Sequence, residues 1–167
     1  GLKDVAANIT EAGILRAIHL AEDTLKRAGN ARPSIAVAAL NPHAGDHGKF
    51  GREEIDIITP AIEACQRQQM DVSGPWPSDT VFLKARRGEV DAVVTMYHDQ
   101  GQIAIKLMGF ERGVTVAGGL PIPIATPAHG TAFDIAGQNK ANVSAIRQAF
   151  DLLLRMAKTH SDNKKSA

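Results

Sequence analysis

The apolar run from Ser34 to Leu40 constrains the fold more than any other stretch of the chain. Its sequence, Ser-Ile-Ala-Val-Ala-Ala-Leu, shows no polar alternation, so the strand that it predicts is covered on both faces. A second run, Asp91-Ala-Val-Val-Thr95, is rich in β-branched residues and predicts another buried strand that continues to Tyr97. Strands of this kind belong to parallel sheets with helices on either side. The sequence therefore predicts an α/β fold with a mainly parallel sheet and flanking helices.

Helical patterns and turn signals fill the stretches around these two strands. Thr10 is expected to cap the first helix, Pro60 to end or kink the second, and Ser78-Asp79 to cap the third. The predicted helices span residues 10–29, 52–68, 78–87 and 143–158, with one or two helical turns at 102–108 and a short strand and turn at 72–77.

The C-terminal part of the chain predicts two more extended segments and a closing helix. Gly113–Gly119 is expected to form a strand and Pro121–Ile124 an extended edge segment. The closing helix repeats apolar residues at helical spacing, which predicts that they share one face. They are Ile146, Phe150, Leu153, Leu154 and Ala157.

Composition excludes several classes of function. A net charge of +1 argues against a nucleic-acid partner. The single cysteine, Cys65, excludes an internal disulfide framework and fits a reducing compartment, and its helical surroundings predict a buried thiol instead of a nucleophile. No apolar run approaches the length of a membrane span. We therefore expect a cytoplasmic protein with no membrane partner.

Two histidines follow the two buried strands. His43 lies in Asn41-Pro-His-Ala-Gly45 and His98 in Met96-Tyr-His-Asp-Gln-Gly101, each beside a glycine-containing turn. Open α/β sheets bind ligands at the carboxyl ends of their strands, and neighbouring strands can bring two imidazoles within reach of one divalent ion. Two histidines leave such a metal site incomplete. The alternatives are two unrelated loop histidines, or a His98 that only hydrogen-bonds to its neighbour.

Five segments, taken in order, resemble the C-terminal half of the 4-hydroxythreonine-4-phosphate dehydrogenase family. They are Asn41–Gly45, Pro77-Ser-Asp-Thr80, Met96–Gly101 with Lys106, Gly119-Leu-Pro121 and His129-Gly-Thr-Ala132. The resemblance, and a chain that begins without methionine, imply that residues 1–160 are half of a two-domain enzyme with a fold like that of isocitrate and isopropylmalate dehydrogenases. A linking helix would come first, then a core at 32–158, and a polar tail at 161–167.

The resemblance also implies an activity and a set of site residues. The family oxidises a phosphorylated four-carbon 3-hydroxy acid with NAD and then releases carbon dioxide, as a homodimer with active sites at the subunit interface. By this resemblance His43 and His98 are metal ligands, Lys106 contacts substrate, and Asp79 and Asp99 lie at the catalytic site, where they orient groups or move protons. A third metal histidine would precede Gly1. Imidazole ligands suit zinc or cobalt, and substrate oxygens would also accommodate manganese or magnesium.

Residues 129–142 resemble the adenosine-binding loop of isocitrate and isopropylmalate dehydrogenases. The resemblance implies that Asn142 faces adenine and that the Asp134 carboxylate accepts ribose hydroxyls and repels a 2′-phosphate, which favours NAD. The alternative is a glycine turn that merely starts a helix. The implied cofactor contacts are His129, Gly130, Thr131, Ala132, Asp134 and Asn142.

Two departures from the biosynthetic enzymes bear on the substrate. The positions that carry an asparagine and an arginine in those enzymes are Thr115 and Ile124 here. Losing the arginine removes a bidentate anion contact, and the pattern is closer to the branch that handles 4-phospho-D-threonate or 4-phospho-D-erythronate. The alternatives are 4-hydroxythreonine-4-phosphate itself, an aromatic-acid dihydrodiol, a non-catalytic module that binds dinucleotide or metal, and a purely structural dimerisation domain.

Overall fold

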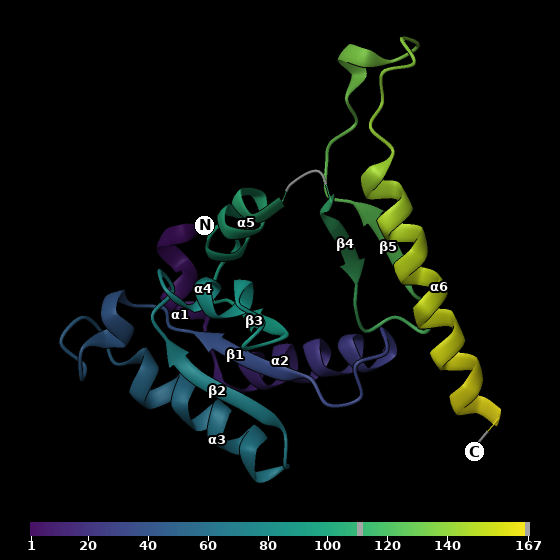
Figure 1. The fold of residues 1–167 in the computed structure, drawn as a ribbon. Coiled ribbons are helices and arrows are strands. Elements are labelled where there is room, and N and C mark those ends of the chain that lie inside the picture. Colours follow the sequence, from purple (N-terminus) through teal and green to yellow (C-terminus); the bar gives the residue numbers. More distant parts are fainter. Residues whose placement is uncertain (110–111, 166–167) are drawn as a thin grey trace.

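The computed structural model of the protein describes residues 1–109 and 112–165. Two sheets divide them into an N-terminal region (residues 1–109) and a C-terminal region (residues 112–165) (Figure 1). The helices of the N-terminal region are α1 (Val5–Asn8), α2 (Glu11–Arg27), α3 (Thr59–Arg67), α4 (Val81–Arg86) and α5 (His98–Gly109), and its strands are β1 (Ser34–Ala38), β2 (Asp71–Trp76) and β3 (Ala92–Val94). The C-terminal region contains β4 (Val114–Ala117), β5 (Ile124–Pro127) and α6 (Ser144–Lys165).

The predicted central strand, β1, lies in the middle of a three-stranded parallel sheet in the order β2-β1-β3. Its alternate side chains pack on opposite faces of the sheet. Ile35 and Val37 pack with α2 and α3, whereas Ala36 and Ala38 pack with Val81 of α4. Helices therefore cover both faces (Figure 1), and the predicted α/β class with a parallel sheet is confirmed.

The second sheet was not anticipated. β4 and β5 pair antiparallel, and the expected extended segment at 121–124 becomes a strand only from Ile124 onward. Val114, Val116, Ala125 and Pro127 form the half-buried face, and α6 packs against this hairpin.

Three predictions about helix ends were tested, and one of them is confirmed. Thr10 caps α2, since its Oγ1 accepts the Gly13 N–H at 3.1 Å. Pro60 does not end the second helix: a π-helical turn at Glu54–Ile58 runs directly into α3, and Pro60 lies in the first turn of α3, where a missing N–H is tolerated. Ser78-Asp79 do not cap α4: they lie in a turn closed by Pro77, whose carbonyl accepts the N–H of Thr80 and of Val81.

The third buried strand is shorter than predicted, and the helix after it is longer. β3 ends at Val94, and α5 begins at His98 itself and runs to Gly109. The side chain of Gln100, in the first turn of α5, accepts the Met96 N–H at 2.8 Å and so ends the strand. His98 is therefore the first residue of a helix and not the last residue of a strand.

The predictions for the closing helix were partly wrong. α6 continues to Lys165, so residues 161–165 of the expected polar tail are helical, whereas 166–167 lie outside the described residues. The predicted apolar face is not the buried one: Ala145, Ala149 and Met156 are buried. Ile146, Phe150 and Leu154 are exposed instead.

No described helix is both long enough and apolar enough to span a bilayer.

Candidate functional site

The two candidate metal histidines follow neighbouring parallel strands. β1 and β3 pair in register, with Val37 opposite Val94, so both strands end at the same edge of the sheet. His43 lies in a 3-10 turn after β1, and His98 opens α5 after β3. Both side chains are exposed. The fold therefore delivers both imidazoles to one edge without a direct contact between them.

The loop that carries His43 has an unusual backbone. Six consecutive residues, 43–48, have positive φ, and of these only Gly45 and Gly48 are glycines. For residues with a Cβ, this left-handed conformation is strained by roughly 1–2 kcal/mol each. The His43 ring lies near that of Phe50, with centroids 6.3 Å apart. Other contacts must stabilise this loop if it is to hold His43 in one place.

His98 has a carboxylate partner in the next residue. Its Nδ1 lies 2.7 Å from Oδ1 of Asp99. When that contact is a hydrogen bond from Nδ1–H, Nε2 keeps its lone pair and is free to bind a metal. The pairing is the arrangement in which a carboxylate orients a ligand histidine and raises its basicity.

A groove between α4 and α5 brings Asp79 and Asp99 together. It has a volume of about 430 Å³, and Phe82 and Leu83 line one side while Ile103 and Leu107 line the other. Arg86 and Tyr97 also line it, and the sequence reasoning singled out neither of them. The position of Tyr97 next to His98 was the available signal; nothing in the sequence marked Arg86.

Lys106 is exposed near the end of α5 and does not line this groove. It lies seven residues after Asp99, which places both on one side of the helix, about 10 Å apart along its axis.

The two substrate-branch positions share one surface. Thr115 and Ile124 lie on the exposed face of the β4-β5 sheet, where Thr115 pairs with Thr126 and Ile124 with Ala117. The two side chains are therefore diagonal neighbours, close enough to contact one ligand.

The expected cofactor loop surrounds a hollow. The connection between β5 and α6 projects away from both sheets (Figure 1), and residues 129–142 enclose an open space of about 690 Å³. His129, Gly130, Thr131, Ala132 and Asn142 all line it. Asp134 does not line it; its carbonyl accepts a hydrogen bond from Gln138.

The donor set fits part of a metal site. No group of three or more histidine, cysteine or carboxylate side chains converges in the described part of the chain. Two exposed imidazoles, one of them oriented by a carboxylate, are suitable ligands for zinc or a similar ion that also receives a donor from elsewhere. Cys65 is not a candidate: it is buried as predicted, and burial raises the pKa of its thiol.

Two further side chains at this edge were missed from the sequence. Glu54 and Gln100 are buried and bind the backbone close to the strand ends that lead to the histidines. The polar pattern of their neighbours gave no signal of burial. A glutamate inside a predicted surface helix is normally exposed.

The chain is similar to known proteins over almost its whole length. Residues 1–153 match the family described as "Pyridoxal phosphate biosynthetic protein PdxA". The 4-hydroxythreonine-4-phosphate dehydrogenase of Beijerinckia indica is 53% identical over 142 residues, which are 85% of this chain and 42% of that protein. The D-threonate 4-phosphate dehydrogenase of Salmonella typhimurium is 46% identical over 156 residues, which are 93% of this chain and 48% of that protein.

A solved structure agrees with these sequence relatives. The crystal structure of 4-hydroxythreonine-4-phosphate dehydrogenase from Klebsiella pneumoniae superposes with a TM-score of 0.82 at 43% identity, covering 94% of this chain and 47% of that one. The chain thus spans about half the length of the curated relatives it matches.

Proposed function

The chain belongs to the PdxA family, and from that premise we propose that the full-length protein is a dehydrogenase of a phosphorylated four-carbon hydroxy acid. We further propose that it uses NAD and a divalent metal ion and that oxidation is followed by decarboxylation. The observation that carries this proposal is the pair of neighbouring parallel strands, β1 and β3, that lead to His43 and to His98 at one edge of the sheet.

Each residue at this edge has a role that its geometry supports. His43 and His98 would hold the metal ion, with a third ligand from the part of the protein outside this chain. Asp99 would orient the His98 ring through the 2.7 Å contact to Nδ1. Asp79 faces the same groove as Asp99, so either carboxylate can accept the hydroxyl proton through water. When bound, the metal and NAD would supply a positive charge beside the hydroxyl and an acceptor for the hydride.

The hollow at 129–142 is the proposed place for the adenosine end of NAD. Its glycines let the backbone approach a ligand closely, and Asn142 lines it with a side-chain amide able to donate to and accept from a base edge. The exposed carboxylate of Asp134 lies next to the lining residues and would repel a 2′-phosphate, which supports NAD over NADP.

The substrate is proposed to be 4-phospho-D-threonate or 4-phospho-D-erythronate. Thr115 and Ile124 share the exposed face of the β4-β5 sheet and offer no cation to a substrate carboxylate or phosphate there. Lys106, exposed on α5, remains available for one anionic group of the substrate.

We infer that the functional unit is a homodimer with its active sites at the interface. The supporting observation is the apolar surface that the described residues leave open, which includes Phe150 on α6 and Leu107 on α5. Phe150 is 61% exposed and Leu107 is 84% exposed, and a second copy would cover such side chains.

The full-length protein tests the proposal directly. NADH formation would be followed with the two sugar-acid phosphates, with 4-hydroxythreonine-4-phosphate and with an aromatic cis-dihydrodiol acid, before and after chelation of metal. His43→Ala is expected to lower kcat/KM by about 100-fold or more, because a metal ligand contributes several kcal/mol of charge stabilisation. His47→Ala, in the same loop, is the matched control and is expected to keep activity.

The outcomes separate the alternatives. Turnover of the sugar-acid phosphates that chelation abolishes supports the proposal. Faster turnover of 4-hydroxythreonine-4-phosphate would show that Thr115 and Ile124 do not decide the substrate branch. Metal or NAD binding without turnover of any compound would indicate a binding module, and equal activity of the His43 and His47 variants would reject the metal centre.

A further inference from the structure

Two buried polar side chains lie where the sheet meets the candidate metal site. Glu54 is 3% exposed and Gln100 is 9% exposed, and among the residues whose side chains the structure describes no other polar or charged side chain is buried. Burying a carboxylate is unfavourable unless its oxygens are hydrogen-bonded. Both side chains therefore call for a local explanation.

Glu54 binds the segment that leads from β1 to His43. Its Oε1 accepts the N–H groups of Leu40 at 2.9 Å and of Asn41 at 2.7 Å, and its Oε2 accepts the Asn41 side-chain amide at 2.9 Å. These three hydrogen bonds satisfy both oxygens of the carboxylate. The carboxylate thus fixes the two residues that immediately precede Pro42 and His43.

Gln100 binds the same segment from the first turn of α5. Its Nε2 donates to the carbonyl oxygen of Ala39 at 2.9 Å, and its Oε1 accepts the Met96 N–H at 2.8 Å. Ala39 follows β1, and Met96 lies between β3 and His98. One amide therefore links the exit of the strand that leads to His43 with the exit of the strand that leads to His98.

The strained loop after β1 explains why such a link is needed. A left-handed run of residues 43–48 will relax unless its ends are fixed. Glu54 also packs directly under the loop, because a Cβ at Gly45 would lie 2.7 Å from its Oε2. The buried carboxylate therefore fixes both the start and the underside of the loop that carries His43.

We propose that Glu54 and Gln100 are positioning residues that set the separation and orientation of His43 and His98 for a shared metal ion. Neither side chain would touch the metal. Residues 39–41 are held from below by Glu54 and from the side by Gln100, so the two imidazoles move as one unit with the sheet. This inference rests on the proposed metal centre.

The test measures metal binding, which does not depend on turnover. The full-length protein would be stripped of metal and titrated with cobalt(II), with the visible absorption spectrum reporting ligand geometry and thermal unfolding reporting stability. The variants are Glu54→Gln, which places an amide group against the Asn41 amide, and Gln100→Met, which keeps the side-chain length but removes both hydrogen bonds.

Gln66→Met is the matched control. Gln66 is also a glutamine whose side chain donates to a strand carbonyl, that of Val72 at 2.8 Å, but Gln66 is exposed and Val72 lies at the start of β2 and not at the edge of the histidines. All three variants are expected to lower the melting temperature. Only Glu54→Gln and Gln100→Met are expected to weaken cobalt binding, by about 10-fold to 100-fold, and to change the cobalt spectrum.

One more substitution, in the loop itself, separates loop strain from general destabilisation. Ala44 has a φ of 52°, so Ala44→Gly relaxes the loop without removing any hydrogen bond. Combined with Glu54→Gln, it is expected to recover part of the lost cobalt affinity, because a less strained loop depends less on the carboxylate. Recovery of this kind is a coupling between the two sites that a purely structural role would not produce.

The outcomes distinguish this inference from the proposed function. Wild-type protein that binds cobalt, with Glu54→Gln and Gln100→Met binding it as tightly as Gln66→Met does, would overturn the positioning role and leave the metal centre standing. Wild-type protein that binds no cobalt would overturn the metal centre and this inference with it. Selective loss of affinity in the two variants supports both.

Discussion

The N-terminal region has a buried core between its sheet and its helices, whereas few described side chains of the C-terminal region are buried; both regions expose large apolar side chains, among them Leu107 and Phe150. Ile18, Ile35 and Ile58 are almost completely buried between the parallel sheet and the helices on one face. Among the α6 side chains whose burial the structure describes, residues 144–159, the buried ones are Ala145, Ala149 and Met156, and Phe133 on the projecting loop is 82% exposed. The N-terminal region is thus a scaffold with a core of its own, whereas the described part of the C-terminal region buries little of its apolar surface.

This difference matches what each region offers to a ligand. The scaffold fixes His43, His98, Asp79 and Asp99 around the end of a packed sheet. The C-terminal region carries the proposed cofactor hollow on a loop that projects from the fold (Figure 1). A metal site of the proposed kind needs accurately placed ligands, whereas a loop can adjust when a ligand binds.

Substitutions that shorten buried side chains are expected to have the largest effects on stability. They test the difference between the two regions most directly. Ile18→Ala in the 167-residue chain is expected to lower the free energy of unfolding by about 2–5 kcal/mol, because it leaves a cavity in a closed core. Phe150→Ala is expected to change it by no more than about 0.5 kcal/mol, because the ring is exposed in the chain alone. Urea unfolding would measure these changes. Fluorescence of Trp76, the single tryptophan, would report the free energy of unfolding of the Ile18 variant, and far-UV circular dichroism would report that of both variants.

Equal losses for the two variants would show that the C-terminal region has a core of its own. In the full-length protein the Phe150 variant gives a sharper result. If a second copy covers that ring, Phe150→Ala should weaken dimerisation in sedimentation experiments.

The contact between the two regions is the next test. Arg27, at the end of α2, donates from Nη1 to the Leu120 carbonyl at 2.9 Å and from Nη2 to the Pro121 carbonyl at 3.4 Å. Arg27→Met is expected to cost about 1–2 kcal/mol, the value of losing charged hydrogen bonds at a partly exposed site. Hydrogen exchange should rise across β4 and β5 and stay unchanged in β1. Arg67→Met, which removes only an exposed pair with Glu63, is the control and should have almost no effect.

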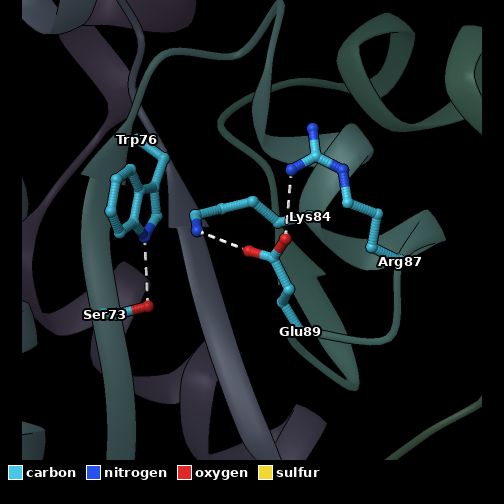
Figure 2. A network of polar contacts seen from close by, with 5 residues as sticks. All are labelled: Ser73, Trp76, Lys84, Arg87 and Glu89. Carbon is cyan, nitrogen blue, oxygen red and sulfur yellow. Dashed lines mark hydrogen bonds and ion pairs between the residues drawn. The ribbon is translucent and has the colours of Figure 1, made fainter.

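The smallest expected effect lies on the surface of the scaffold. Lys84 donates to Glu89 at 2.8 Å and lies over the Trp76 ring, 4.5 Å from its centre, while Arg87 contacts the other oxygen of Glu89 (Figure 2). The hydrogen bond from Lys84 holds the pKa of the Glu89 carboxyl below its usual range. A lowered carboxyl pKa means that the contribution to stability is complete above the usual carboxyl range and is lost as the pH falls through the lowered value.

Lys84→Met is therefore expected to raise the pKa of Glu89 and to change Trp76 fluorescence, with little change in stability at neutral pH. A carbon-detected NMR titration of the glutamate carboxyls would measure the pKa. Ser73→Ala removes only the hydrogen bond from the Trp76 indole N–H (Figure 2), so the Glu89 titration should stay as in the wild type. An unchanged Glu89 titration in the Lys84 variant would contradict the assigned cause.

The scaffold was largely predictable from the sequence because its signals are local and strong. The continuous apolar run at Ser34–Leu40 predicted a central strand, which the structure has at Ser34–Ala38, and Thr10 predicted the start of α2. The start of α5 was missed because the β-branched run and His98 lie close together, and because Gln100, whose side chain ends the strand at Met96, also makes a long-range contact to Ala39. That contact spans 61 residues and leaves no local pattern.

The C-terminal region was predicted less well for a different reason. Apolar spacing along α6 indicates that Phe150 and Leu154 share a face, but it does not say which surface covers that face. Within the chain α6 packs against the hairpin and α2, and the side chains that it buries are the small Ala145 and Ala149 and, further on, Met156. The left-handed loop at 43–48 was also unpredictable, because residues with a Cβ seldom adopt positive φ and Ala44 is not of a type that favours it.

The candidate site was predicted as a set of residues but not as an arrangement. The sequence placed His43 and His98 after two strands, and the structure adds that these strands are neighbours. The roles of Glu54 and Gln100, whose side chains bind the backbone where the strands end, could not be predicted from the sequence. Their burial depends on elements that meet only in the folded chain.

The contact between Arg27 and the carbonyl of Leu120 joins two segments that the ribosome synthesises at different times. The two residues are 93 positions apart in the chain. At about 5–20 residues per second, a ribosome delivers Leu120 roughly 5–20 seconds after Arg27. Small α/β folds complete in far less time. In the cell, the sheet of the N-terminal region can therefore close first, and β4, β5 and α6 are synthesised against a surface that has already folded.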